Sequence, residues 1–173
     1  MVTQERILVV IGAILAALLQ IVLAPHIMLF GAVPNIIAAY VLLVSVLRAR
    51  SAGSVLPFAM GLFYDLFTGG PVGAMAFSLT TVSFVASHFF ASMDNDTAFM
   101  PLVTVAAGAL LVELVYGLFL LLFGYPAGLL GALGYRILPC TVYDIVVAFA
   151  LFPLLRRLFS PSVQVRSDIT QLR

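Results

Sequence analysis

Long apolar runs separated by short polar loops fill almost all of this sequence, and a chain built in this way cannot fold as a water-soluble globule. Hydrophobic residues occupy 64% of the 173 positions, and charged residues only 9%. Soluble domains carry about 25% charged residues, which they need for a surface that faces water. The sequence therefore predicts an integral membrane protein.

The lengths of the apolar runs predict how many helices cross the membrane, because a spanning helix needs roughly 17–25 apolar residues. We predict an all-α fold: a polytopic bundle of six transmembrane helices that forms a single domain over residues 1–160, followed by a short cytoplasmic tail at 161–173. The predicted spans are 6–24, 31–47, 54–67, 72–90, 98–123 and 136–159. The third covers only about 21 Å of a core of about 30 Å. It therefore either begins earlier, near Arg50, or forms a partly re-entrant pair with the fourth.

The placement of basic residues predicts the orientation. All eight are Arg, and with the N-terminus in the cytoplasm seven of them lie on the cytoplasmic side, while only Arg136 lies outside. Cytoplasmic loops of membrane proteins carry an excess of Lys and Arg. We therefore expect both termini to be cytoplasmic.

Several function classes are not supported by the sequence. Without Lys or a basic tract there is no nucleic-acid footprint, and the single Cys140 cannot form an internal disulfide or a Cys-based metal cluster. The sequence contains no H-E-x-x-H, G-x-S-x-G or P-loop motif. Asp65 and Asp144 are a conceivable aspartyl pair, but their flanking sequences do not support it. We expect no catalytic residue, no metal, no cofactor and no nucleic-acid partner, and we expect membrane lipids to surround the chain.

Three carboxyl side chains, Asp65, Glu113 and Asp144, interrupt the predicted spans. A charge at the bilayer centre costs about 2.5–3.5 kcal/mol, so such residues usually face a bundle interior, a partner helix or a substrate path. We expect a role in holding the bundle together, in binding a partner helix, or in handling protons or substrate, and these alternatives stay open. The predicted buried polar core consists of Glu113, Asp144, Arg136, Tyr116 and Tyr143.

Small residues recur at a spacing of four next to these acids and in the first span. Gly61 precedes Asp65 by four positions, and the first span carries Ala13 and Ala17. Small residues at this spacing allow two helix backbones to approach closely. The face with Ala13 and Ala17 is therefore expected to dock either another helix of this chain or a partner protein.

The stretch from Gly61 to Gly73, G-L-F-Y-D-L-F-T-G-G-P-V-G, resembles the signature of the rod shape-determining protein MreD family. That signature has a G-L-x-x-D helix end, a Gly/Pro turn and a Gly that opens the next helix. Pro34-Asn35 also resembles the family, whereas Phe63 and Tyr64 replace its more usual aliphatic pair. Chain length and short loops agree along nearly the whole sequence.

The resemblance implies a non-enzymatic part of the bacterial cell-elongation machinery in the inner membrane. Such proteins bind the single-span protein MreC and act alongside MreB, a RodA-type glycosyltransferase and a class B penicillin-binding protein in lateral peptidoglycan synthesis, which sets cell shape. The implied fold is similar to the substrate-binding subunits of energy-coupling-factor vitamin transporters. Gly61 and Asp65 are the positions carried over from the family. The candidates for partner binding or helix packing are Gly61, Asp65, Gly69, Gly73, Ala13 and Ala17.

Two transporter classes are alternatives. A substrate-binding subunit of a vitamin transporter has a similar length and helix number, and would use Ala13 and Ala17 to dock its coupling protein. The absence of Trp and the Gly-, Ala- and Leu-rich outer loops argue against a vitamin pocket. A proton-coupled transporter would use Glu113 and Asp144, but the sequence shows no internal repeat.

Overall fold

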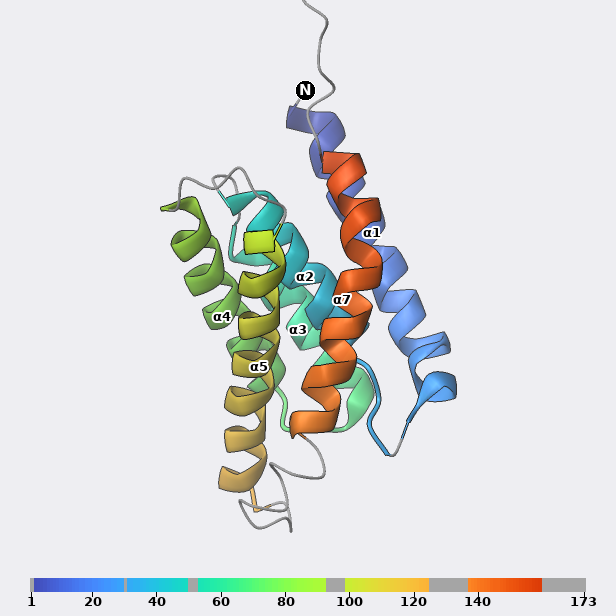
Figure 1. Ribbon diagram of the computed structural model, residues 1–173. Helices are drawn as coiled ribbons and strands as arrows, with labels where there is room; N and C mark the ends of the chain where they lie inside the picture. The colour runs from blue at the N-terminus through green and yellow to red at the C-terminus, as the bar shows by residue number, and fades with distance from the viewer. Residues whose placement is uncertain (1, 30, 50–52, 93–98, 125–136, 160–173) are drawn as a thin grey trace, which may run out of the picture.

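The computed structural model describes residues 2–29, 31–49, 53–92, 99–124 and 137–159, and almost all of this part of the chain is helical. One β-bridge between Leu29 and Ala32 is the only strand-type pairing in the described ranges. The prediction of an all-helical fold is confirmed, and the described residues form six α-helices (Figure 1). The elements are α1 (Val2–Val22), the short 3-10 helix η1 (Ala24–Ile27), α2 (Ile36–Leu47), α3 (Val55–Thr68), α4 (Ala74–Ala91), α5 (Phe99–Leu122) and α7 (Leu138–Phe159).

The helices fall into two length classes. Four described segments are long and apolar enough to cross a membrane: Gln4–Val22, Ala74–Ala91, Phe99–Leu122 and Leu138–Phe159. The 12 residues of α2 and the 14 of α3 cover only about 18 and 21 Å at 1.5 Å per residue. Of the six predicted spans, four thus have full spanning length and two do not.

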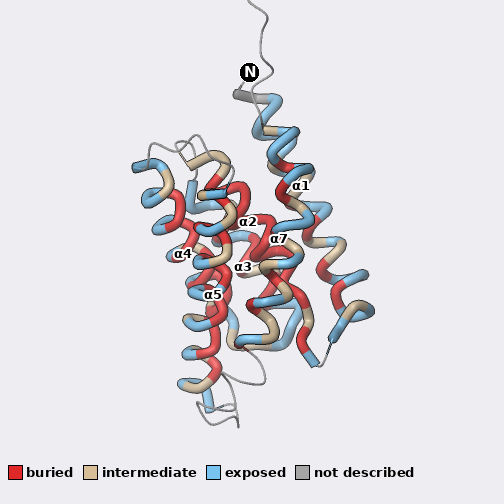
Figure 2. Tube along the Cα trace, in the orientation of Figure 1, coloured by how far each residue is buried: buried red, intermediate tan, exposed pale blue. Residues whose placement is uncertain are grey.

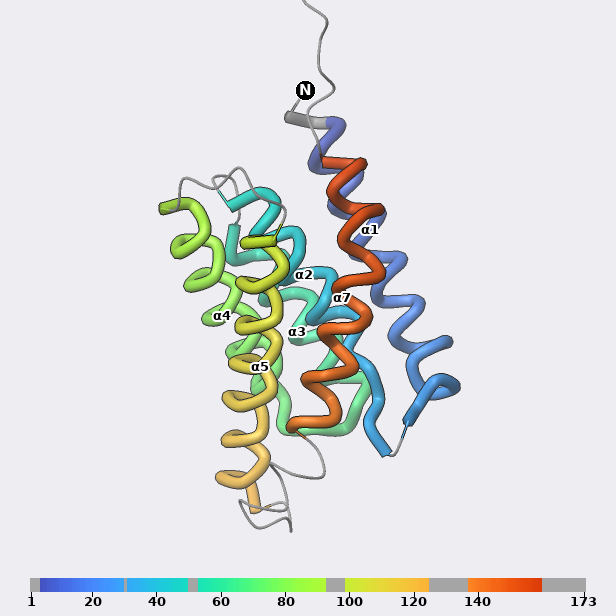
Figure 3. The backbone as a smooth tube through the Cα atoms, viewed as in Figure 1, coloured from blue at the N-terminus to red at the C-terminus, as the bar shows by residue number. Residues whose placement is uncertain are grey.

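The start of α2 corrects the predicted span 31–47. The helix begins at Ile36, because Pro34 disfavours helical backbone at the residue before it and Asn35 then caps the first turn. The Asn35 side-chain oxygen accepts a hydrogen bond from the Ala38 amide at 2.9 Å. Residues 31–35 run inward from the end of the bundle to reach this point (Figure 3).

The short helix α2 forms the centre of the bundle. Every residue from Ile36 to Val46 is buried, as expected for a helix that is apolar all round. Helices α1, α3, α4, α5 and α7 all contact it, and Figure 2 shows the buried positions concentrated where they face it. The core is therefore a single layer of helices packed around α2.

Helix α1 lies at the edge of the bundle and is joined to α2 through small residues (Figure 1). Ala13 and Ala16 are buried, and Ala17 is partly buried against the core. A side chain at Gly12 would overlap the Tyr40 hydroxyl, which donates a hydrogen bond to the Val9 carbonyl at 2.7 Å. The small-residue face of α1 therefore docks a helix of this same chain.

Candidate functional site

The carboxylate of Asp65 caps the N-terminus of α4. Asp65 is 1% exposed. Its Oδ2 accepts hydrogen bonds from the amides of Gly73 at 2.9 Å and Ala76 at 3.2 Å, and the Met75 amide lies 3.0 and 3.1 Å from its two oxygens. Gly73, the N-cap residue, has no side chain to do this, and a helix N-terminus favours a negative charge. Asp65 thus acts as a cap supplied from the preceding helix.

The glycines of the signature motif shape the same α3–α4 corner. A Cβ on Gly61 would lie 2.5 Å from the Ala76 Cα, so the two helices touch backbone to backbone here. Gly69 and Gly73 have φ values of 69° and 93°, a backbone conformation that residues other than glycine rarely adopt. The motif therefore fixes how α3 turns into α4 and brings Asp65 to its amides.

A second capped N-terminus, that of α2, lies inside the bundle. The Gln20 side-chain oxygen accepts from the Ile36 amide at 2.7 Å, while its Nε2 donates to the Pro34 carbonyl at 3.1 Å. The Asn35 amide donates to Asp144 Oδ1 at 2.6 Å. Helices α1 and α7 therefore both supply side chains that seal the start of α2.

Gln20 and Asn35 were not among the predicted site residues. Gln20 is a single amide in the otherwise apolar run of the first span, and Asn35 belongs to the Pro-Asn pair quoted for the family resemblance. An isolated polar side chain in an apolar helix was the available signal for Gln20.

The two remaining acids lie close together in the interior. Glu113 is 4% exposed and Asp144 1%, and the two carboxyl groups are near enough to influence each other electrostatically. Asp144 Oδ2 has no hydrogen-bond partner among the described residues. Two like charges in a buried site would repel each other, and both carboxyl groups lie inside the bundle and not on its outer surface.

The other members of the predicted polar core occupy different positions. Tyr116 is buried, and its ring meets that of Tyr64 edge-on with centroids 6.1 Å apart. Tyr143 is only half-buried, and its hydroxyl donates to the Ile27 carbonyl, which ties α7 to η1. Arg136 lies outside the described residues.

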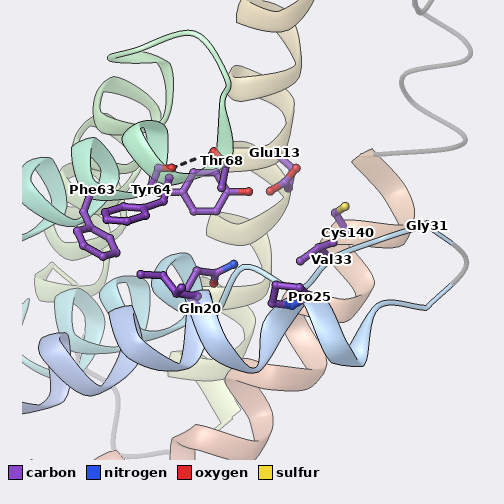
Figure 4. A pocket seen from close by; sticks show the side chains of 11 residues that line it. Gln20, Pro25, Gly31, Val33, Phe63, Tyr64, Thr68, Glu113 and Cys140 are labelled. Atoms are coloured by element: carbon purple, nitrogen blue, oxygen red, sulfur yellow. Dashed lines mark hydrogen bonds between the residues drawn. The ribbon is translucent and has the colours of Figure 1, made fainter.

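A pocket of about 370 Å³ opens beside these groups at one end of the bundle, among α1, α3, α5 and α7. Its buried wall includes Gln20, Tyr64 and Glu113, and exposed Phe67 and Gly31 lie at its rim. In Figure 4 the Tyr64 hydroxyl and the Glu113 carboxyl point toward each other across the pocket. The remaining lining residues are Ile21, Pro25, Val33, Phe63, Thr68 and Cys140.

The described Arg residues gather at the opposite end of the bundle, where α1 begins and α2 and α7 end (Figure 1). Arg48 forms an ion pair with Glu5 at 2.8 Å, and Arg156 and Arg157 lie in the last turn of α7. One end of the bundle is thus basic, and the buried carboxyl groups and the pocket lie toward the other end.

Taken together, these features define a multi-pass helical membrane protein whose intramembrane carboxyl groups are buried within the bundle. A sequence model of the rod shape-determining protein MreD matches residues 2–161, and the chain belongs to this family. No curated protein and no solved structure matches it. The resemblance that the Gly61–Gly73 motif indicated is therefore confirmed. Family membership implies a structural role in rod shape determination at the membrane.

Proposed function

We propose that this protein is a non-enzymatic scaffold of the bacterial cell-elongation complex. In this proposal it lies in the inner membrane with both termini in the cytoplasm and binds an MreC-like single-span protein. It thereby supports lateral peptidoglycan synthesis by a RodA-type glycosyltransferase and a class B penicillin-binding protein. The family match and the four long apolar helices support a membrane role in shape determination.

One observation carries the scaffold proposal: the polar groups of the signature motif hold the fold together from inside. Asp65 is buried and bound to α4 amides, and Gly61 is in close backbone contact with α4. Residues arranged in this way define a fixed corner between two helices. A scaffold needs such fixed geometry, because a rigid face loses less conformational entropy when a partner binds.

We place the partner contact on the outward surface of this α3–α4 corner. Leu66 and Val72 are 64% and 68% exposed there, directly next to Asp65 and Gly73. A single transmembrane helix of a partner would pack against these apolar side chains, and the motif would control their position. Asp65, Gly61, Gly69 and Gly73 would then act on partner binding indirectly, through the shape of the corner.

Co-purification with the MreC-like partner tests this placement. The double variant Leu66→Ala/Val72→Ala should reduce recovery of the partner at least fivefold at unchanged bundle stability, since both side chains are exposed. Asp65→Ala should also weaken recovery. The matched control is Leu118→Ala/Leu122→Ala, which removes two exposed apolar side chains of α5 and should leave recovery unchanged. Full recovery with both corner variants would reject the placement.

We also propose, from the family resemblance, a fold similar to the substrate-binding subunits of energy-coupling-factor transporters. The pocket at one end of a six-helix bundle is the observation that favours it. An experimental structure whose helices do not superimpose on such a subunit would refute this similarity.

A further inference from the structure

We propose that the basic end of the bundle binds an anionic phospholipid, whose phosphate lies between Arg6 of α1 and Arg157 of α7 and whose acyl chains follow the apolar surfaces of these two helices. A scaffold role does not require a bound lipid, so this inference goes beyond the proposed function.

The side chain of Arg48 connects the start of α1 with the end of α7. Its guanidinium pairs with Glu5 at 2.8 Å and lies 5.7 Å from the centre of the Phe159 ring. One residue at the end of α2 thus reaches both helices, so their ends are neighbours (Figure 1). Arg6 follows Glu5 directly, and Arg157 precedes Phe159 by two positions. The two Arg side chains therefore start from adjacent helix ends.

The charges at this end favour an anion. Arg6 and Arg157 are exposed. Glu5 is the one acid at this end among the described residues, and it is already paired with Arg48. A phosphate group placed between two guanidinium groups gains charge-assisted hydrogen bonds from both. The end of the bundle therefore attracts a phosphate more strongly than a neutral headgroup.

Helices α1 and α7 expose long apolar surfaces beside these charges (Figure 2). Within their apolar stretches only 17% and 28% of the residues are buried, against 50% in α4 and 44% in α5. Both helices pack against α2, and they separate toward the other end of the bundle (Figure 1). The surface on either side of this separation can accommodate acyl chains.

The depth of the charges selects a lipid as the source of the phosphate. Arg6 lies near the start of the apolar stretch of α1, and Arg157 lies in the last turn of α7. Both are therefore at the height of the headgroups when these helices cross a bilayer. Exposed Leu8 and Leu154 come next toward the bilayer centre. A phospholipid presents its phosphate and its acyl chains in this same order. In the proposed orientation it belongs to the cytoplasmic leaflet.

An introduced Trp can report which lipid lies beside it, because the chain contains no Trp of its own. Leu154→Trp places the reporter at the site, and Val85→Trp places a matched control on α4. The replaced side chains are 54% and 53% exposed, and both lie in the last two turns of their helices. Each full-length variant is reconstituted in bilayers of phosphatidylcholine and phosphatidylglycerol. Quenching of Trp fluorescence by brominated phosphatidylglycerol is then compared with quenching by brominated phosphatidylcholine.

Each Arg near the membrane surface strengthens the binding of an anionic lipid about fivefold. The preference for phosphatidylglycerol at Leu154→Trp should therefore reach about tenfold or more, whereas Val85→Trp should show no preference. Equal preferences at the two reporters would refute the site. Weak quenching of Leu154→Trp by both lipids would show that protein, such as a second copy of this chain, covers this face, and it would also overturn the proposal.

Two double variants, made together with Leu154→Trp, test the roles of the Arg residues. Arg6→Gln/Arg157→Gln should remove most of the preference, while the matched control Arg6→Lys/Arg157→Lys keeps both charges and should retain most of it. A preference that survives in the Gln variant would overturn the role of these two residues. The measurement uses the purified chain alone, so its outcome is independent of whether the MreC-like partner binds.

Discussion

The carboxylate of Asp65 offers the sharpest quantitative prediction. Asp65→Ala removes the acceptor of the Gly73, Met75 and Ala76 amides. Gly73 lies at the partly exposed turn, but Met75 and Ala76 are fully buried. A buried amide left without an acceptor costs about 1–3 kcal/mol. Two of them give an expected loss of about 2–6 kcal/mol in the free energy of unfolding, more than an ordinary helix cap contributes.

Reversible unfolding in mixed micelles, with rising mole fraction of dodecyl sulfate and helicity followed by circular dichroism, measures this loss. Asp65→Asn keeps one carbonyl oxygen in place and should lose about half as much as Asp65→Ala. The control Glu5→Ala breaks the exposed ion pair with Arg48 and should change stability by less than about 1 kcal/mol. If the free energy of unfolding of Asp65→Ala lies within about 0.5 kcal/mol of the value for the unmodified protein, the buried amides do not depend on this carboxylate.

Three further substitutions test the other fixed points of the bundle by the same unfolding assay. Gln20→Leu leaves the buried Ile36 amide without its acceptor and should cost about 1–3 kcal/mol; a neutral result would mean that another group caps α2. Gly61→Ala places a Cβ against the Ala76 backbone, and this overpacking should lower the free energy of unfolding by about 1–3 kcal/mol. Unchanged stability would contradict the close contact between α3 and α4. Gly73→Ala, at φ 93°, should cost about 1 kcal/mol, and a gain in stability would show that the turn can relax.

Much of the helical framework was predictable from the apolar runs alone. The predicted span 54–67 differs from α3 by one residue at each end, and 98–123 differs from α5 by one at each end. Hydrophobicity and local breakers such as the Gly69–Gly70–Pro71 turn determine these boundaries, so no tertiary information is needed. The span 31–47 began too early, because apolar composition alone cannot distinguish the extended residues before Asn35 from helix.

The partners of the polar side chains were not predictable in the same way. Asp65 was expected to matter, but its acceptor role depends on amides 8 to 11 positions later, which the turn folds back onto it. Gln20 bonds the Ile36 amide 16 positions away, so its role follows only from how the chain re-enters the bundle. The spacing of apolar residues in the sequence predicts which face of a helix is buried. The hydrogen-bond partners of polar side chains depend on how distant parts of the chain pack together.

The start of α2 also has a consequence for how the protein is made. Asp144 lies 109 positions after Asn35, yet it accepts the hydrogen bond of the Asn35 amide. During synthesis α2 therefore leaves the ribosome long before α7, which carries its last acceptor. The set of hydrogen bonds at the start of α2 is therefore complete only after α7, the last helix of the described residues, has been synthesised and has packed against it.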